Sequence, residues 1–200
     1  MEISLRSSAP VVTGRLGRVV TDRLELQPID EKSVTALAPV FAKPEVWKYP
    51  YGRAFGAAET EEFVASQTEH WNVLGFGLWL VIDRHSSRTL GYVGLAVPTF
   101  LPQVLPAVEV GWRLDPDVWG NGYATEAGAA ALDGAFGALG LPQVISLPQV
   151  DNPASVRVAE RLGMHASHTI LAPETQSRGP VEIVVMELTS DQWLSRNPGT

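Results

Sequence analysis

The octapeptide Trp119-Gly120-Asn121-Gly122-Tyr123-Ala124-Thr125-Glu126 carries more structural information than any other stretch of this 200-residue chain. Glycine lets backbone N–H groups approach a ligand without interference from a Cβ atom. The residues before the octapeptide indicate a strand, and those after it indicate a helix. A glycine turn that opens a helix combines unpaired N–H donors with the positive end of the helix dipole. The segment therefore predicts an anion site suited to a pyrophosphate.

Two common phosphate-binding loops do not match the octapeptide. A P-loop ends in Gly-Lys-Ser/Thr, and the octapeptide contains no lysine. A Rossmann fingerprint needs Gly or Ala three residues after its second glycine, where this chain has Thr125. Glycine before a helix is also compatible with a strand–helix turn that needs only flexible residues, so the loop alone leaves that alternative open.

Hydrophobic patterning on either side of the octapeptide indicates alternating strands and helices. Apolar stretches bounded by turn residues predict strands over residues 24–29, 78–83, 89–97, 107–114, 144–150, 167–171 and 181–188. Helical periodicity predicts helices over residues 33–41, 59–71, 122–139 and 152–162. Gly91 and Gly94 inside one strand predict a bulge or a close backbone approach. This order of elements indicates an α/β or α+β fold with a mixed sheet.

The ends of the chain carry weaker signals. Residues 1–18 show no clear period and predict a loose arm or an added edge strand. We expect an N-terminal extension over residues 1–18, one domain over residues 19–190 and a short tail over residues 191–200.

Composition and charge narrow the classes of function. The net charge of −7 argues against nucleic acid as the main partner, since phosphate neutralisation needs clustered Lys and Arg. The absence of cysteine excludes disulfides, thiolate–zinc sites and a cysteine nucleophile. The four histidines lie without metal-ligand spacing, so no metal is expected. No apolar run reaches the length of a membrane span and no secretory signal is evident, so we expect a cytoplasmic protein with no membrane partner.

Residues 115–127 closely resemble the GNAT superfamily of acetyl-CoA-dependent acyltransferases, in particular the ribosomal-protein N-terminal (alanine/serine) acetyltransferase branch. Gly122 and Ala124 match the last two fixed positions of the family loop Arg/Gln-x-x-Gly-x-Gly/Ala, and Trp119 stands where Arg or Gln is usual. Residues 109–114 resemble the family's fourth strand, and residues 152–155 and 160–164 resemble its next helix and the following turn. The resemblance spans about residues 21–188.

The resemblance implies the GNAT fold. In it a mixed, mostly antiparallel central sheet is splayed between its fourth and fifth strands and flanked by helices on both faces, and acetyl-CoA lies in the gap. Strand backbone near Trp112 would pair with the pantetheine arm, and amides of the glycine loop would hold the pyrophosphate. The cofactor-binding residues implied are Trp112, Arg113, Leu114, Trp119, Gly120, Asn121, Gly122, Tyr123, Ala124, Thr125, Asn152 and Ser155.

Candidate catalytic residues follow from the needs of acetyl transfer, which are a deprotonated amine and a route to protonate the leaving thiolate. Without cysteine a thioester on the enzyme is impossible, so direct transfer in a ternary complex is expected. Many relatives use a tyrosine as general acid, but this chain has Ala159 there. Ser155 matches a serine of the ribosomal branch and is expected near the CoA sulfur. Asn152 and Ser155 are equally compatible with a simple helix N-cap.

Glu109 lies on the fourth strand, where some relatives keep a glutamate that passes protons through water. It is also compatible with a structural carboxylate paired with Arg113 or another base. The aromatic loop, residues 43–55 with Trp47, Tyr49 and Tyr51, lines the acceptor site in the family; a hydrophobic lid over the sheet is the alternative.

The function implied is N-acetyl transfer from acetyl-CoA to a primary amine, either a protein N-terminus or a small molecule. A catalytically silent CoA-binding or regulatory domain is the alternative. An interaction module whose glycine loop is only a turn is a third reading. Dimers are common among relatives, so a homodimer is compatible, although the sequence indicates no interface.

Overall fold

The computed structural model describes residues 5–174 and 179–197. Within these residues one eight-stranded sheet has the order β1-β2-β3-β4-β5-β6-β8-β7. The strands are β1 (Val19–Val20), β2 (Leu24–Pro28), β3 (Leu78–Asp83), β4 (Thr89–Ala96), β5 (Glu109–Leu114), β6 (Gln143–Ser146), β7 (His165–Ala172) and β8 (Val181–Thr189). The helices are α1 (Leu5–Ser8), α2 (Ser33–Phe41), α3 (Ala57–Leu74), α4 (Tyr123–Asp133), α5 (Pro153–Arg161) and α6 (Ser190–Arg196). Short turns of helix are η1 (Pro44–Trp47), η2 (Pro102–Val104), η3 (Pro116–Val118) and η4 (Gly134–Ala138).

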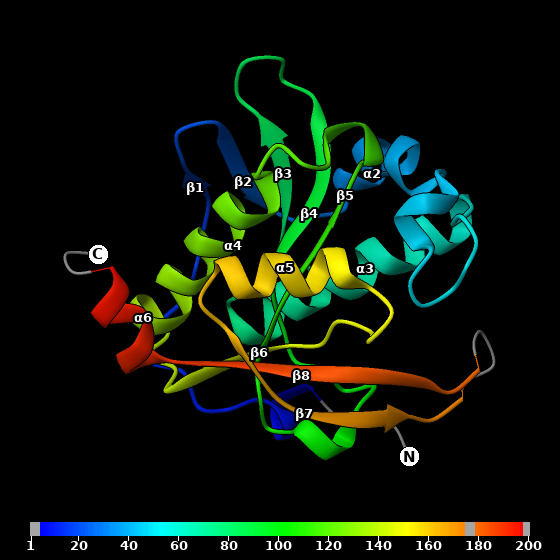
Figure 1. The fold of residues 1–200 in the computed structure, drawn as a ribbon. Helices are drawn as coiled ribbons and strands as arrows, with labels where there is room; N and C mark the ends of the chain where they lie inside the picture. The colour runs from blue at the N-terminus through cyan, green and yellow to red at the C-terminus, as the bar shows by residue number, and fades with distance from the viewer. Residues whose placement is uncertain (1–4, 175–178, 198–200) are drawn as a thin grey trace.

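The sheet is divided between β5 and β6. All its other neighbouring strands pair antiparallel, whereas β5 and β6 are parallel and pair only at Glu109 opposite Ile145. Figure 1 shows the β8–β7 pair running across the direction of β2 to β5. The predicted mixed, mostly antiparallel sheet is confirmed. Because β5 is the strand that resembles the family's fourth strand, the gap between β5 and β6 lies where the resemblance implies it.

Helices cover both faces of the sheet. In Figure 1, α4 and α5 lie in front of the strands and α3 lies behind them. Ala127, Ala131 and Ala135 pack in one core cluster with Val110 of β5, where small side chains allow the helix to lie close to the strands. A second, aromatic-rich core lies on the opposite face, beneath α2, η1 and α3.

Two predicted elements end well before the bounds expected from the sequence. The helix predicted over 122–139 is α-helical only to Asp133 and continues as a wider turn, η4. The strand predicted over 144–150 ends at Ser146, because Pro148 has no N–H to donate and β5 has already diverged. Gln149 retains only an isolated bridge to Ile183.

The segment before β1 is packed, not loose. Leu5, Val12 and Leu16 contact the main core, and the Leu16 N–H donates to the carbonyl of Gly75 (2.8 Å). The indole N–H of Trp79 donates to the carbonyl of Gly17 (2.8 Å). Apolar side chains spaced along an irregular segment bury themselves without helical or strand periodicity, and so the sequence pattern missed this packing.

The bulge or close backbone approach predicted at Gly91 and Gly94 is confirmed: a bulge lies beside Gly91, and the backbone approaches closely at both glycines. The register between β3 and β4 shifts at Val81/Ile82, opposite Gly91. A side chain at Gly91 would collide with the carbonyl of Arg113, and one at Gly94 would collide with the carbonyl of Gly77. These glycines therefore permit close strand approach beside β5.

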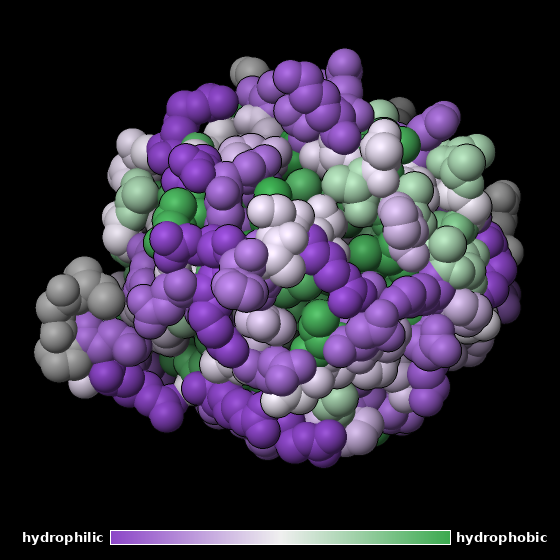
Figure 2. All heavy atoms as spheres, turned by 90° about the horizontal axis from the view of Figure 1, so that it is seen from above, coloured by the Kyte–Doolittle hydropathy of each residue, from purple (hydrophilic) through white to green (hydrophobic). Residues whose placement is uncertain are grey.

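The surface gives a first indication of the site. Seen from above, the molecule shows apolar atoms at the bottom of a hollow whose rim is mostly hydrophilic (Figure 2). Across residues 5–174 and 179–197, no helix combines the length and apolarity needed to cross a membrane.

Candidate active site

The glycine loop presents a row of free backbone donors. Gly120 and Gly122 both have φ 80°, the left-handed region that favours glycine. The first helical hydrogen bond of α4 runs from the Glu126 N–H to the Gly122 carbonyl (3.0 Å). In the described chain, none of the backbone N–H groups of residues 120–125 donates to a protein acceptor. Six successive free donors at a helix N-terminus form a site for an anion.

Arg23, just before β2, holds this loop from behind. Its Nε donates to Glu126 Oε2 (2.6 Å) and its Nη1 to the carbonyl of Asn121 (2.9 Å). Its guanidinium also lies 4.5 Å from the ring centre of Tyr123. Burial opposes ionisation of Glu126, but hydrogen bonds from Thr21 and Arg23 outweigh it and lower its pKa. The loop is therefore fixed before any ligand arrives.

A second set of contacts holds the chain just before the glycine loop and centres on the carboxylate of Asp115. This carboxylate is only 3% exposed and accepts from Lys43 Nζ (2.7 Å) and Arg88 Nη2 (2.7 Å). Asp117 contacts the same two bases at 2.8 and 3.0 Å but is largely exposed. Burial opposes ionisation of Asp115, yet Lys43, the Asp117 amide and Arg88 together lower its pKa. The cluster ties the entrance of the glycine loop to β4 and to the start of the aromatic loop.

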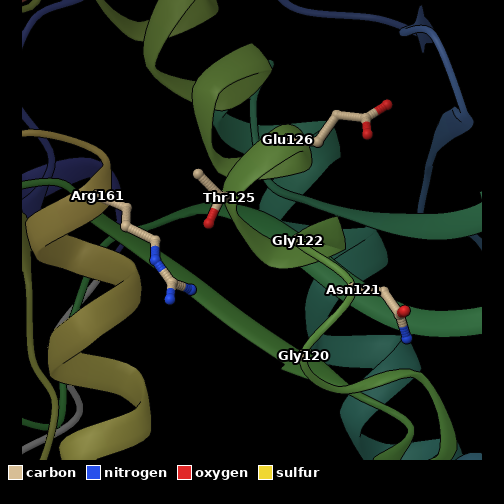
Figure 3. Close-up of a pocket in the computed structure, with 6 residues that line it drawn as sticks. All are labelled: Gly120, Asn121, Gly122, Thr125, Glu126 and Arg161. Atoms are coloured by element: carbon tan, nitrogen blue, oxygen red, sulfur yellow. The ribbon is translucent and has the colours of Figure 1, made fainter.

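An open cavity of ≈ 530 Å³ adjoins the loop and is lined by Gly120, Asn121, Gly122, Thr125, Glu126 and Arg161. Figure 3 shows Arg161 reaching from α5 towards Thr125, while the side chains of Asn121 and Glu126 point away. Arg161 has no ion-pair partner in the described chain. Arg161 was not among the residues expected at the site, because a single arginine late in a helix carries no pattern.

The edge of β5 that faces β6 is open beyond Val110. The Asp115 N–H donates to the Leu90 carbonyl (2.7 Å), so the backbone groups of odd-numbered β5 residues face β4. Those of Trp112 and Leu114 therefore face the gap. The Trp119 indole N–H donates to the Leu114 carbonyl (2.8 Å), so of these two residues Trp112 keeps both its N–H and its carbonyl free in the described chain.

Glu109 lies where β5 and β6 part. Burial raises its pKa to about 7, while the charge of Arg113 and the Leu147 amide oppose this shift. No ion pair between Glu109 and Arg113 forms in the described structure. A carboxyl group with a pKa near neutrality can hold or release a proton at physiological pH, as a general base must.

The Arg113 side chain binds groups other than Glu109. Its Nη1 donates to the carbonyls of Val46 and Tyr49 (2.8 Å to Tyr49), and its Nε donates to the hydroxyl of Tyr92 (3.1 Å). Its guanidinium lies 4.1 Å from the Trp47 ring centre. The Arg113 side chain thus holds the aromatic loop on the face opposite α4, and its backbone faces β4.

Asn152 and Ser155 occupy the start of α5. Asn152 is the N-cap, and its side-chain oxygen accepts the Ser155 backbone N–H (3.2 Å). The capping interpretation of Asn152 is thereby confirmed, and it leaves the Ser155 hydroxyl uninvolved in the cap. Ala159, at the position of the family tyrosine, is fully buried.

The structure gathers these groups from separate segments into two sets, one on each face of β5. The glycine loop and Arg161 face each other at the start of α4, while Glu109 and the aromatic loop lie on the opposite face of β5. Throughout residues 5–174 and 179–197, no cluster of three or more His, Asp or Glu could hold a metal ion.

Comparison with known proteins gives a consistent result. A model of the acetyltransferase (GNAT) domain matches residues 23–165. An uncharacterized protein, YkkB of Bacillus subtilis, is 32% identical over 154 residues, covering 76% of this chain and 88% of that protein. The FsC-acetyl coenzyme A-N(2)-transacetylase of Aspergillus fumigatus is 32% identical over 186 residues, covering 87% and 77%. A ribosomal-protein-S5-alanine acetyltransferase from Vibrio fischeri has a similar fold, with TM-score 0.69, 16% identity and coverage of 88% and 98%.

Proposed function

The chain belongs to the GNAT family of acetyltransferases, and on this premise we propose that it transfers an acetyl group from acetyl-CoA directly to a primary amine. The observation that carries the proposal is the row of six free backbone N–H groups from Gly120 to Thr125. Such a row suits a diphosphate, and the chain has no cysteine that could hold an acyl group between two half-reactions. The proposed direct transfer requires both substrates to be bound together.

The donor would bind on the α4–α5 side of the gap. The amides of residues 120–125 would hold its pyrophosphate, and Arg161 would add a positive charge across the same cavity. The free edge of Trp112 would pair with the amide groups of the pantetheine arm. When bound, acetyl-CoA supplies the acetyl group as a reactive thioester.

Glu109 would remove the proton that the amine must lose. An N-terminal amine has a pKa of about 8, and the pKa of Glu109 is about 7. Because the two values are close, transfer of a proton from the amine to Glu109 costs little free energy near neutral pH. Glu109 alternates with Val110, which packs on the α4 side, so Glu109 lies on the opposite face of β5 and would meet an acceptor that approaches from the side away from the donor's phosphates.

Ser155 would donate a hydrogen bond to the departing sulfur. Its backbone N–H, not its hydroxyl, satisfies the Asn152 cap, so the hydroxyl is available. The N-terminus of α5 also favours negative charge near it. Asn152 would act by fixing the first turn of this helix.

A silent CoA-binding domain is the second candidate, because buried Ala159 replaces the tyrosine that many relatives use as general acid. If the protein is an active acetyltransferase, the acceptors to be tested are protein N-termini and small primary amines.

One assay separates these candidates. Release of CoA thiol is followed with acetyl-CoA and a panel of primary amines: alanine- and serine-initiated peptides, spermidine and hexylamine. Amine-dependent thiol release supports acetyl transfer. Tight acetyl-CoA binding without release for any amine supports the silent domain.

A further inference from the structure

Two contacts join the diverging strands on the face of the sheet opposite α4. At the base of the fork, Glu109 pairs in register with Ile145, and the Leu147 amide is near enough to lower the carboxyl pKa of Glu109. Farther along, the Tyr49 hydroxyl donates to the carbonyl of Asp151 (2.7 Å). Because Arg113 binds the Tyr49 carbonyl, this second contact links the end of β5 to the segment before α5.

Gly111 lies midway between these two contacts. Residues 109, 111 and 113 share one face of β5, and four residues of strand span about 13 Å. A Cβ atom at Gly111 would meet nothing closer than Glu109 Oε1 at 3.7 Å. Its φ lies outside the left-handed region, and so neither packing nor backbone conformation requires glycine there. Its cross-strand partner is Gly94, which also has no side chain.

The aromatic loop and α3, which pack over this face, contain buried polar atoms that lack a hydrogen-bond partner. Within the described residues, the buried side-chain polar atoms without a hydrogen-bond partner are Trp47 Nε1 and Gln67 Oε1. Trp47 lies against Arg113, and Gln67 lies on α3 one turn beyond Phe63, which packs against Tyr92 of β4. Buried polar groups are nearly always paired, so this donor and this acceptor mark two places over this face where a polar partner is lacking.

We propose that the acceptor amine approaches along the Gly111 side of β5, between Glu109 and the Tyr49–Asp151 contact, and that the lack of a side chain at Gly111 admits a substituent beside the amine nitrogen. The inference rests on the proposed acetyl transfer and adds its specificity determinant. The absent side chain leaves space next to the carboxylate that would take the proton. A methyl group at this position would occupy that space.

The test compares Gly111→Ala and Gly111→Val with wild type on two matched pairs of amines. Hexylamine and 2-aminoheptane differ by one methyl on the carbon next to nitrogen, as do glycine- and alanine-initiated peptides of otherwise equal sequence. Gly17→Ala is the control, since Gly17 also has open space around it and an ordinary φ. Affinity for acetyl-CoA is measured by calorimetry on every variant.

We expect Gly111→Ala to reduce kcat/KM for the branched amine about 10- to 200-fold more than for its unbranched partner, since one methyl group in a tight site has that effect. Acetyl-CoA affinity should equal that of wild type. Equal losses on both amines, unchanged selectivity, or a change confined to acetyl-CoA affinity would overturn the inference while leaving the proposed function intact. A folded wild type that binds acetyl-CoA but acetylates none of these amines would instead contradict the proposed function, and the inference with it.

Discussion

Glu109 stands opposite Ile145 at the one register position where β5 and β6 pair in the described chain. Beyond this pair the strands separate, so the Glu109 carboxyl lies at the base of the gap with protein on both sides. Burial there raises its pKa to about 7. The parting of the sheet thus creates both the space for a donor and the environment of a base.

Replacing Glu109 with Gln tests its role as base. If Glu109 accepts the proton, kcat should fall about 10²- to 10⁴-fold with acetyl-CoA affinity unchanged. In wild type, kcat/KM should rise with pH through about 7, because only ionised Glu109 can accept a proton. In the Glu109→Gln variant, this rise of kcat/KM with pH should be absent. A variant that keeps full activity and the same pH profile would exclude Glu109 as base.

Arg161→Gln should weaken acetyl-CoA binding by about 10-fold, the effect expected for one charge-assisted hydrogen bond to a phosphate. The loss should shrink as salt concentration rises, because screening weakens the contribution of an exposed charge. Arg157→Gln, one turn earlier on α5 and absent from the cavity lining, is the matched control. Calorimetry at two salt concentrations measures both effects, and equal losses for the two variants would show only a general charge effect.

Ser155→Ala and Asn152→Ala separate catalysis from capping. Ser155→Ala keeps the cap, since Asn152 accepts the backbone N–H of Ser155, so stability should be unchanged while kcat falls. Asn152→Ala should reduce the free energy of unfolding by about 1 kcal/mol. Urea unfolding and steady-state kinetics on both variants supply the comparison. A Ser155→Ala enzyme with wild-type kcat would leave Ser155 with no catalytic role.

Asp115→Asn should destabilise the protein by about 1.5–3 kcal/mol at pH 7, because it weakens two hydrogen bonds to charged groups at a buried site. The pKa of Asp115 is lowered in the folded state, so its contribution is fully present above about pH 4 and is lost as pH falls below that. Asp117→Asn, which contacts the same bases from an exposed position, should cost less than about 1 kcal/mol. Equal costs from urea unfolding would contradict the assigned importance of burial.

Much of the fold could be predicted from local patterns. Glycine spacing marked the loop at Gly120 and Gly122 and the bulge at Gly91, since positive φ and close strand approach leave a direct trace in residue type. The span of α2, residues 33–41, followed from its periodicity.

The missed features depend on long-range packing. Arg161 lines the cavity beside the glycine loop only because α5 lies beside α4, and Arg113 holds the aromatic loop only because Val46 and Tyr49 fold over β5. The raised pKa of Glu109 depends on burial at the fork. Local spacing does not encode such contacts between distant segments.

The central claim is that residues 120–125 bind acetyl-CoA, and calorimetric titration of acetyl-CoA into wild type, Gly122→Trp and Gly52→Trp tests it most directly. Gly52 is the matched control because it too has positive φ, and an added Cβ would meet nothing within 4 Å there and only Arg23 Nη2, at 3.6 Å, at Gly122. We expect micromolar binding to wild type and Gly52→Trp and none to Gly122→Trp, with all three shown to be folded by circular dichroism. Absence of binding to folded wild type, or equal affinity of Gly122→Trp, would contradict the account.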